Sequence, residues 1–152
     1  MWTQIVGKTR MKLTPLENHY WNATLYVTPR GLTTSPIPYP EGTFDVAFDF
    51  ITHELAIRSS SGEERAVALA ARPVADFYAD YLGQLRAMGI DVTIHTKPDE
   101  FDDPTPFDQD TRHASYDKEY VERFRRTLIW VDRVFKLFRC AHPIPTIFAA
   151  SQ

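Results

Sequence analysis

The segment TFDVAFDFI, residues 43–51, alternates hydrophobic and polar residues with a period of two. One side of the segment carries Phe44, Val46, Phe48 and Phe50. The other side carries Asp45, Ala47 and Asp49. Successive side chains of an extended chain point to opposite faces, so this pattern is typical of a β-strand with one buried face and one wet face. Such strands belong to antiparallel sheets, which limits the folds open to this chain.

Two further strand-like runs follow after short connections. ELAIRSS begins after the turn TH, and RAVAL follows SSGEE. Connections of two to five residues join neighbouring antiparallel strands. The three runs therefore predict an antiparallel meander.

Helical spacing predicts three helices around this meander. In the first thirteen residues an alternating pattern competes with a helical one, and we favour the helix because apolar spacings of 3, 4 and 4 extend from Trp2 to Leu13. A second helix starts at Pro73 and ends before Gly89, which suits a left-handed cap. A third, capped by Asp117, runs to about residue 139. Its apolar stripe consists of Val121, Phe124, Leu128, Val131, Phe135 and Phe138.

Two more strands, WNATLYVT (21–28) and IDVTIH (90–95), are predicted from their β-branched and aromatic residues. Residues 99–110 contain six acids, two prolines and no base, which predicts an exposed connection. The order of elements predicts one α+β domain over residues 1–152. Helices would cover one face of a mainly antiparallel sheet, and a long helix would lie near the C-terminus.

Composition indicates the compartment and the classes of partner more clearly than it indicates the function. The formal net charge of −3 gives no whole-chain attraction to nucleic-acid phosphates. The single cysteine, Cys140, cannot form an internal disulfide, which favours a reducing compartment. No stretch approaches the ~20 apolar residues of a membrane span, and the N-terminus lacks the pattern of a signal peptide. We therefore expect a soluble, cytoplasmic protein without nucleic-acid or membrane partners.

Several distinctive stretches occur together: WTQIVGKTRMKLTPLENHYWN, LYVTPRGLTTSPIP, FDFITHELAIR, VADFY and PFDQDTRHASYD. On these stretches the chain resembles an uncharacterised bacterial family, domain of unknown function 5996. The resemblance implies a fold and a bacterial, soluble setting, and it implies no activity. Similar proteins begin upstream of Met1 and continue beyond the long helix into further strands, where this chain has CAHPIPTIFAASQ. We therefore expect an incomplete version of a longer family domain, truncated at both ends.

The stretch PRGLTTSPIPYPEG, residues 29–42, is a candidate ligand site. The candidate ligand-binding residues around the strand at 21–28 are Glu17, His19, Trp21, Arg30, Thr33, Thr34 and Ser35. Arg30 would bind a carboxylate or phosphate, and the hydroxyls would orient a polar ligand. Prolines also favour extended geometry and protect sheet edges, so a stiff connector or edge strand is the favoured alternative. Ser35 as a nucleophile, with His19 as its base, ranks third.

A second candidate site is FDQDTRH, which contains Asp108, Asp110 and His113 within six residues. Two carboxylates and an imidazole would bind a divalent metal and leave positions open for water. With His19 as a base, this would be a metal-assisted, hydrolase-like enzyme, and His113 is also a candidate catalytic residue. The favoured alternative is an acidic loop before a helix, in which His113 merely hydrogen-bonds to the turn. No other cofactor is predicted.

Three functions therefore stay open. The first is a small-ligand-binding domain with a pocket near residues 17–35, lined by Trp21 and Tyr26. The second is the metal-assisted enzyme. The third is a structural or interaction domain, because apolar faces at Trp2, Ile5 and residues 135–138 would pack against another chain, including a second copy. The basic residues of the last helix indicate a solvated face more readily than a nucleic-acid site.

Overall fold

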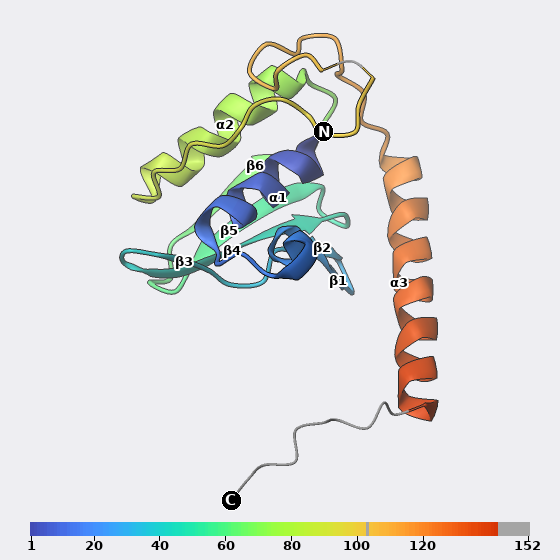
Figure 1. The fold of residues 1–152 in the computed structure, drawn as a ribbon. Coiled ribbons are helices and arrows are strands. Elements are labelled where there is room, and N and C mark those ends of the chain that lie inside the picture. Colours follow the sequence, from blue (N-terminus) through green and yellow to red (C-terminus); the bar gives the residue numbers. More distant parts are fainter. Residues whose placement is uncertain (103, 143–152) are drawn as a thin grey trace, which may run out of the picture.

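A computed structural model describes residues 1–102 and 104–142. It contains a six-stranded antiparallel sheet with helices, and the predicted α+β class is confirmed (Figure 1). The helices are α1 (Trp2–Leu13), the 3-10 helix η1 (Asn18–Ala23), α2 (Val74–Ala87) and α3 (Lys118–Ala141). The strands are β1 (Tyr26–Thr28), β2 (Gly31–Thr33), β3 (Ile37–Tyr39), β4 (Gly42–Asp49), β5 (Glu54–Ser59) and β6 (Glu64–Ala68).

The predicted meander is confirmed as β4-β5-β6, which forms one side of the sheet and ends at the edge strand β6. The strand order is β1-β2-β4-β5-β6, and β3 also pairs with β4. Phe48 of β4 lies opposite Leu55, which in turn lies opposite Val67, so one face of the sheet carries a continuous row of apolar side chains. All three are buried. The period-two pattern in the sequence therefore identified the buried face.

Within residues 29–42 two short strands lie along β4, and only β3 is an edge strand, since β2 lies between β1 and β4. β2 pairs with one end of β4 and β3 with the other. Between them, the Thr34 amide donates to Val46 O at 2.9 Å, and the Val46 amide donates to Thr34 Oγ1 at 3.0 Å. The hydroxyl thus replaces a backbone acceptor where Ser35, with φ of 57°, interrupts the strand.

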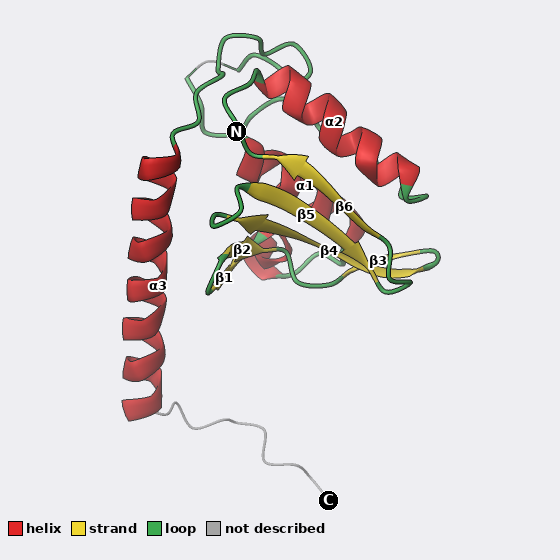
Figure 2. Cartoon of the chain, turned by 180° about the vertical axis from the view of Figure 1, so that it is seen from behind, coloured by secondary structure: helices red, strands yellow, loops and turns green. Residues whose placement is uncertain are grey.

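Helices α1 and α2 cover the apolar face of the sheet, and Figure 2 shows the opposite face uncovered. Ile5 and Val6 of α1 are completely buried, as are Phe77 and Tyr81 of α2. The ring of Trp2 stacks on Phe77, with centroids 4.5 Å apart. The first-helix prediction is therefore confirmed, and its apolar face closes the core.

Two strand predictions were wrong in whole or in part. Only Tyr26–Thr28 of the segment 21–28 is a strand, because the chain before it turns through η1, where His19 and Tyr20 are left-handed. The segment 90–95 has no assigned strand. Its inward residues Ile90, Val92 and Ile94 are buried, although none of the described β-ladders includes this segment.

The acidic segment 99–110 is less exposed than its composition predicts. Phe107 and Asp110 are both fully buried. Phe107 packs beside Tyr78 of α2, with ring centroids 6.4 Å apart. One aromatic residue therefore anchors an otherwise polar connection to the core.

Helix α3 leaves the top of the molecule and runs past the β1 side of the sheet (Figure 1). Asp117 caps it, as predicted, by accepting hydrogen bonds from the amides of Glu119 and Tyr120. None of its residues is fully buried. Across the residues that the structure describes, no helix is both long and apolar enough to cross a membrane.

Candidate functional site

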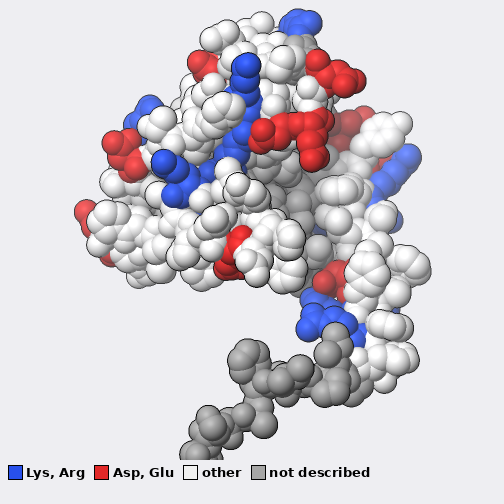
Figure 3. Space-filling view, viewed as in Figure 1, with Lys and Arg blue, Asp and Glu red and all other residues white. Residues whose placement is uncertain are grey.

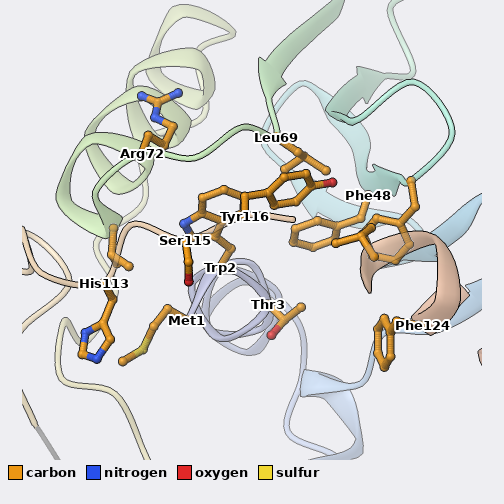
Figure 4. A pocket seen from close by; sticks show the side chains of 13 residues that line it. Met1, Trp2, Thr3, Phe48, Leu69, Arg72, His113, Ser115, Tyr116 and Phe124 are labelled. Carbon is orange, nitrogen blue, oxygen red and sulfur yellow. The ribbon is translucent and has the colours of Figure 1, made fainter. Parts of the chain in front are cut away.

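A cavity of about 350 Å³ lies at the N-terminal end of α1 (Figure 4). It is bounded by the start of α1, the C-terminal ends of β4 and β6, the segment 113–116 and the first turns of α3. The lining residues are Met1, Trp2, Thr3, Phe48, Phe50, Leu69, Arg72, Val74, His113, Ser115, Tyr116, Val121 and Phe124. Most of these side chains are apolar or aromatic, which is typical of small-molecule sites.

Stacked aromatic rings form one wall of this cavity. Trp2 lies between Phe77, at 4.5 Å, and Tyr116, at 5.5 Å between ring centroids. The Tyr116 hydroxyl lies 2.9 Å from Nδ1 of His53. Burial raises the pKa of Tyr116 to about 12, so this phenol stays uncharged at neutral pH. The wall is therefore apolar, and its rings are held in place by packing on both sides.

The polar end of the cavity is His113, which is paired with a buried carboxylate. Oδ2 of Asp110 lies 2.7 Å from Nδ1 of His113, and the Asp110 side chain is fully buried. Oδ1 of Asp110 accepts hydrogen bonds from the amides of Arg112 and His113, each at 3.1 Å. The carboxylate therefore holds the imidazole in one orientation.

Asp110 stays ionised despite its burial. Burial acts to raise its pKa, but hydrogen bonds from His113 and Arg112 outweigh that effect and leave the pKa below the ordinary value of 3.8. An ionised carboxylate accepts a hydrogen bond from Nδ1–H of His113, and whenever the ring is neutral Nε2 is then its acceptor nitrogen. Such a nitrogen is able to accept a hydrogen bond or a proton from a bound molecule.

The same turn also closes the N-terminal end of α2. The amides of Val74 and Ala75 donate to the carbonyl oxygens of His113 and Asp110 at 3.1 and 3.0 Å. Pro73, the N-cap residue of α2, makes no side-chain cap. Residues 110–113 thus replace the missing cap, because the first amides of a helix need partners from outside it. The Asp110–His113 pair therefore has a structural role as well as a place at the cavity.

The structure brings together two of the three predicted metal ligands. Asp110 and His113 are in contact, whereas Asp108 is exposed on the preceding turn. Within the described ranges 1–102 and 104–142, no group of three or more His, Cys, Asp or Glu residues is arranged to hold a metal ion.

The candidates at residues 17–35 do not converge in the same way. Glu17, His19 and Trp21 are exposed on or beside η1. Arg30 pairs with Asp49 and lines a separate hollow of about 320 Å³. The other residues that line this hollow are Thr28, Pro29, Ala47, Phe48, Asp49 and Arg58. The hydroxyl run Thr33–Ser35 is not among them, and Thr34 is committed to the backbone of β4.

Sequence reasoning did not single out Ser115 or Tyr116, and it treated Trp2 only as an apolar surface. These residues are far apart along the chain, and no short motif connects them. One signal was available. The stretch HASYD was among the distinctive segments, and in the folded chain it supplies His113, Ser115 and Tyr116 to one cavity.

The fold and this cavity define an α+β protein in which a buried aspartate holds a half-exposed histidine at the edge of an aromatic cavity. The chain belongs to the Family of unknown function (DUF5996), which it matches over residues 1–143. The family resemblance seen in the sequence is therefore confirmed. Comparisons with curated proteins and with solved structures gave no significant match.

Proposed function

We propose that this chain is a small-molecule-binding domain and that the cavity in Figure 4 is its binding site. The observation that carries this proposal is a mainly apolar, aromatic cavity that is also lined by His113, whose ring is held by Asp110. Apolar walls supply affinity for a ligand, and one oriented polar group supplies specificity. The cavity volume of about 350 Å³ lies within the range of small-molecule pockets.

The polar groups of the cavity indicate the ligand class. The guanidinium of Arg72 is occupied by Asp80 Oδ2 at 3.0 Å and by the Asp76 carbonyl at 2.9 Å. It is therefore a poor partner for a ligand carboxylate. The acceptor at His113 Nε2 instead favours an uncharged ring compound with one hydroxyl or N–H donor.

Indole is the first probe, and 1-methylindole is its matched control without an N–H donor. We expect indole to bind the wild-type chain saturably and 1-methylindole to bind about tenfold more weakly, since one hydrogen bond to a buried site is worth about 1.5 kcal/mol. Ligand-observed NMR titration measures both constants. Equal affinity for the two compounds would exclude the hydrogen bond to His113.

A cavity-filling variant tests the location of the site. Ser115→Phe places a ring in the cavity, and Ser61→Phe places the same ring on the exposed turn after β5. We expect Ser115→Phe to weaken indole binding at least tenfold and Ser61→Phe to leave it unchanged, with both variants retaining the wild-type circular dichroism spectrum. Indole binding that survives in a folded Ser115→Phe variant would place the site elsewhere.

The Asp110–His113 pair favours general-base catalysis as a second candidate function. A buried carboxylate that fixes one imidazole tautomer is a recurrent way to hold a general base. We expect saturable hydrolysis of 4-nitrophenyl acetate that falls at least tenfold in His113→Gln and is unchanged in His19→Gln, which alters an exposed histidine. Equal hydrolysis by the two variants would leave ligand binding as the function of the cavity.

A further inference from the structure

A second cavity, of about 330 Å³, is lined by α1, η1 and the segment 93–95. It shares no lining residue with the cavity in Figure 4. We call it the α1–η1 cavity. Seven of its ten lining residues lie within residues 8–22, inside the distinctive stretch WTQIVGKTRMKLTPLENHYWN. The folded chain therefore gathers part of a distinctive segment around a hollow that the proposed function does not use.

Hydrogen bonds between separate segments fix the walls of the α1–η1 cavity. Nζ of Lys8 donates to the Lys97 carbonyl and pairs with Asp99, each at 2.7 Å, which holds the chain after residue 95 against α1. Nη1 of Arg10 donates to the Trp21 carbonyl at 3.2 Å, which holds η1 against the same helix. A cavity that is formed before the ligand arrives requires less ordering when the ligand binds.

Asn22 supplies an unused polar atom to this cavity. Its side chain is 1% exposed, and its Nδ2 donates to the Met11 carbonyl at 3.4 Å. Its Oδ1 has no hydrogen-bond partner among the residues that the structure describes. Buried polar atoms are nearly always paired, because an unpaired one costs free energy. Oδ1 is an acceptor, so the group that satisfies it must present an N–H or O–H donor.

The ionisable side chains that line the cavity as its charged groups are all basic. They are Lys8, Lys12 and His95, and none of the lining residues is an acid. Lys8 is already paired within the chain, whereas Lys12 and His95 make no hydrogen bond or ion pair with another described residue. Glu17 and Asp91, the acids nearest to lining residues in the sequence, are exposed and lie outside the lining. In Figure 3 basic side chains lie on the visible face around α1. The cavity therefore suits an anion.

Tyr20 contributes an aromatic ring to the cavity through a strained turn. His19 and Tyr20 both have φ of 56°, in the left-handed region that residues other than glycine seldom adopt. Tyr20 is 62% exposed, so burial in the core does not account for this geometry. The turn brings Tyr20 into the same lining as Asn22 and the apolar side chain of Met11. A ring compound packs well against such a wall.

We propose that the α1–η1 cavity binds a small aromatic acid that carries a hydroxyl or N–H donor. Its carboxylate interacts with Lys12 and His95, and its ring packs against Tyr20. Its donor bonds to Oδ1 of Asn22. A polyanion such as a nucleic acid needs many phosphate contacts, whereas this cavity offers one lysine that is not paired within the described chain.

Two probe compounds test this proposal on the full chain. 4-Hydroxybenzoate carries the acid, the ring and the donor, and 4-methoxybenzoate lacks the donor. We expect 4-hydroxybenzoate to bind saturably and 4-methoxybenzoate to bind about tenfold more weakly, because it cannot donate to Asn22. Asn22→Leu should bind the two compounds equally. Isothermal titration calorimetry measures each constant. Equal affinity in the wild type, or no saturable binding of 4-hydroxybenzoate up to about 10 mM, would overturn the proposal.

Charge variants locate the site without altering the core. Lys12→Gln should weaken 4-hydroxybenzoate binding about fivefold, the scale of one exposed ion pair. Lys118→Gln removes the same charge from an exposed position on α3 and should leave binding unchanged. Both variants should keep the wild-type circular dichroism spectrum.

The two cavities should also respond independently. Ser115→Phe, which fills the cavity in Figure 4, should leave 4-hydroxybenzoate binding unchanged, and Lys12→Gln should leave indole binding unchanged. Equal weakening by Lys12→Gln and Lys118→Gln would overturn the assignment to the α1–η1 cavity. Loss of 4-hydroxybenzoate binding in a folded Ser115→Phe variant would overturn it as well.

Discussion

Replacing Gly31 with alanine should destabilise the protein by about 3 kcal/mol or more, the range of severe packing conflicts. A Cβ at Gly31 would lie 2.0 Å from the carbonyl oxygen of Phe48 and 3.0 Å from Cδ2 of Phe50. The carbonyl oxygen belongs to the backbone of β4, so no side-chain rotation relieves the contact. β2 would have to move away from β4, and the Gly31–Asp49 pairing would be lost.

Gly83→Ala is the matched control for this prediction. Gly83 lies inside α2, and nothing would lie within 4 Å of the added methyl group. Alanine favours a helix interior over glycine by about 1 kcal/mol, so this variant should be more stable than the wild type. Urea denaturation gives both changes in the free energy of unfolding. A Gly31→Ala protein within 1 kcal/mol of the wild type would show that β2 is not held closely to β4.

The parts of the fold that sequence patterns predicted are those in which neighbouring residues share one environment. Phe44, Val46 and Phe48 alternate with polar residues because one face of β4 meets α1 and α2 while the other meets solvent. The same reasoning applies to the spacing of Phe77, Tyr81 and Leu85 in α2. Burial of one face imposes a period on the sequence, so the period reveals both the element and its buried side.

The two strand predictions that were wrong rested on residue type alone, without knowledge of which segments pair in the sheet. Residues 90–95 alternate correctly, and Ile90, Val92 and Ile94 are buried, yet the segment has no strand assignment. Trp21, which suited a strand by composition, is 65% exposed because the chain turns at His19 and Tyr20. Both of those residues adopt left-handed geometry, which only a few per cent of non-glycine residues do, so residue type did not predict the turn.

The candidate site was only partly predictable for a related reason. Asp110 and His113 are three residues apart, so a local turn is enough to join them, and their spacing drew attention to them. Trp2, Phe48 and Tyr116 come from distant parts of the chain and meet only after the sheet and helices have packed. Local spacing is visible in a single sequence, whereas convergence across a core is not.

Loss of the Asp110 carboxylate should be the most damaging polar substitution in the described chain. Asp110→Ala removes the acceptor of three hydrogen bonds, including two from backbone amides. Leaving a buried backbone donor without its acceptor costs about 1–3 kcal/mol, and we expect a loss of at least that size. Asp108→Ala removes an exposed carboxylate from the same loop and should change stability by no more than about 0.5 kcal/mol. Urea denaturation at pH 7 compares the two, and equal effects would contradict this assignment.

The pH dependence of stability distinguishes the contribution of the Asp110 charge from the contribution of its shape. Burial acts to raise the pKa of Asp110, but hydrogen bonds from His113 and Arg112 lower it below the ordinary 3.8 of the unfolded chain. The stabilisation is therefore fully present above pH 3.8 and is lost as the pH falls through the lower pKa of the folded state. Asp110→Asn keeps the shape without the charge, so the stability gap between wild type and Asp110→Asn should narrow below pH 3.8. A gap that is constant from neutral pH to about pH 3 would mean that the carboxylate acts through shape alone. The orientation of the His113 ring would then not depend on a charged partner.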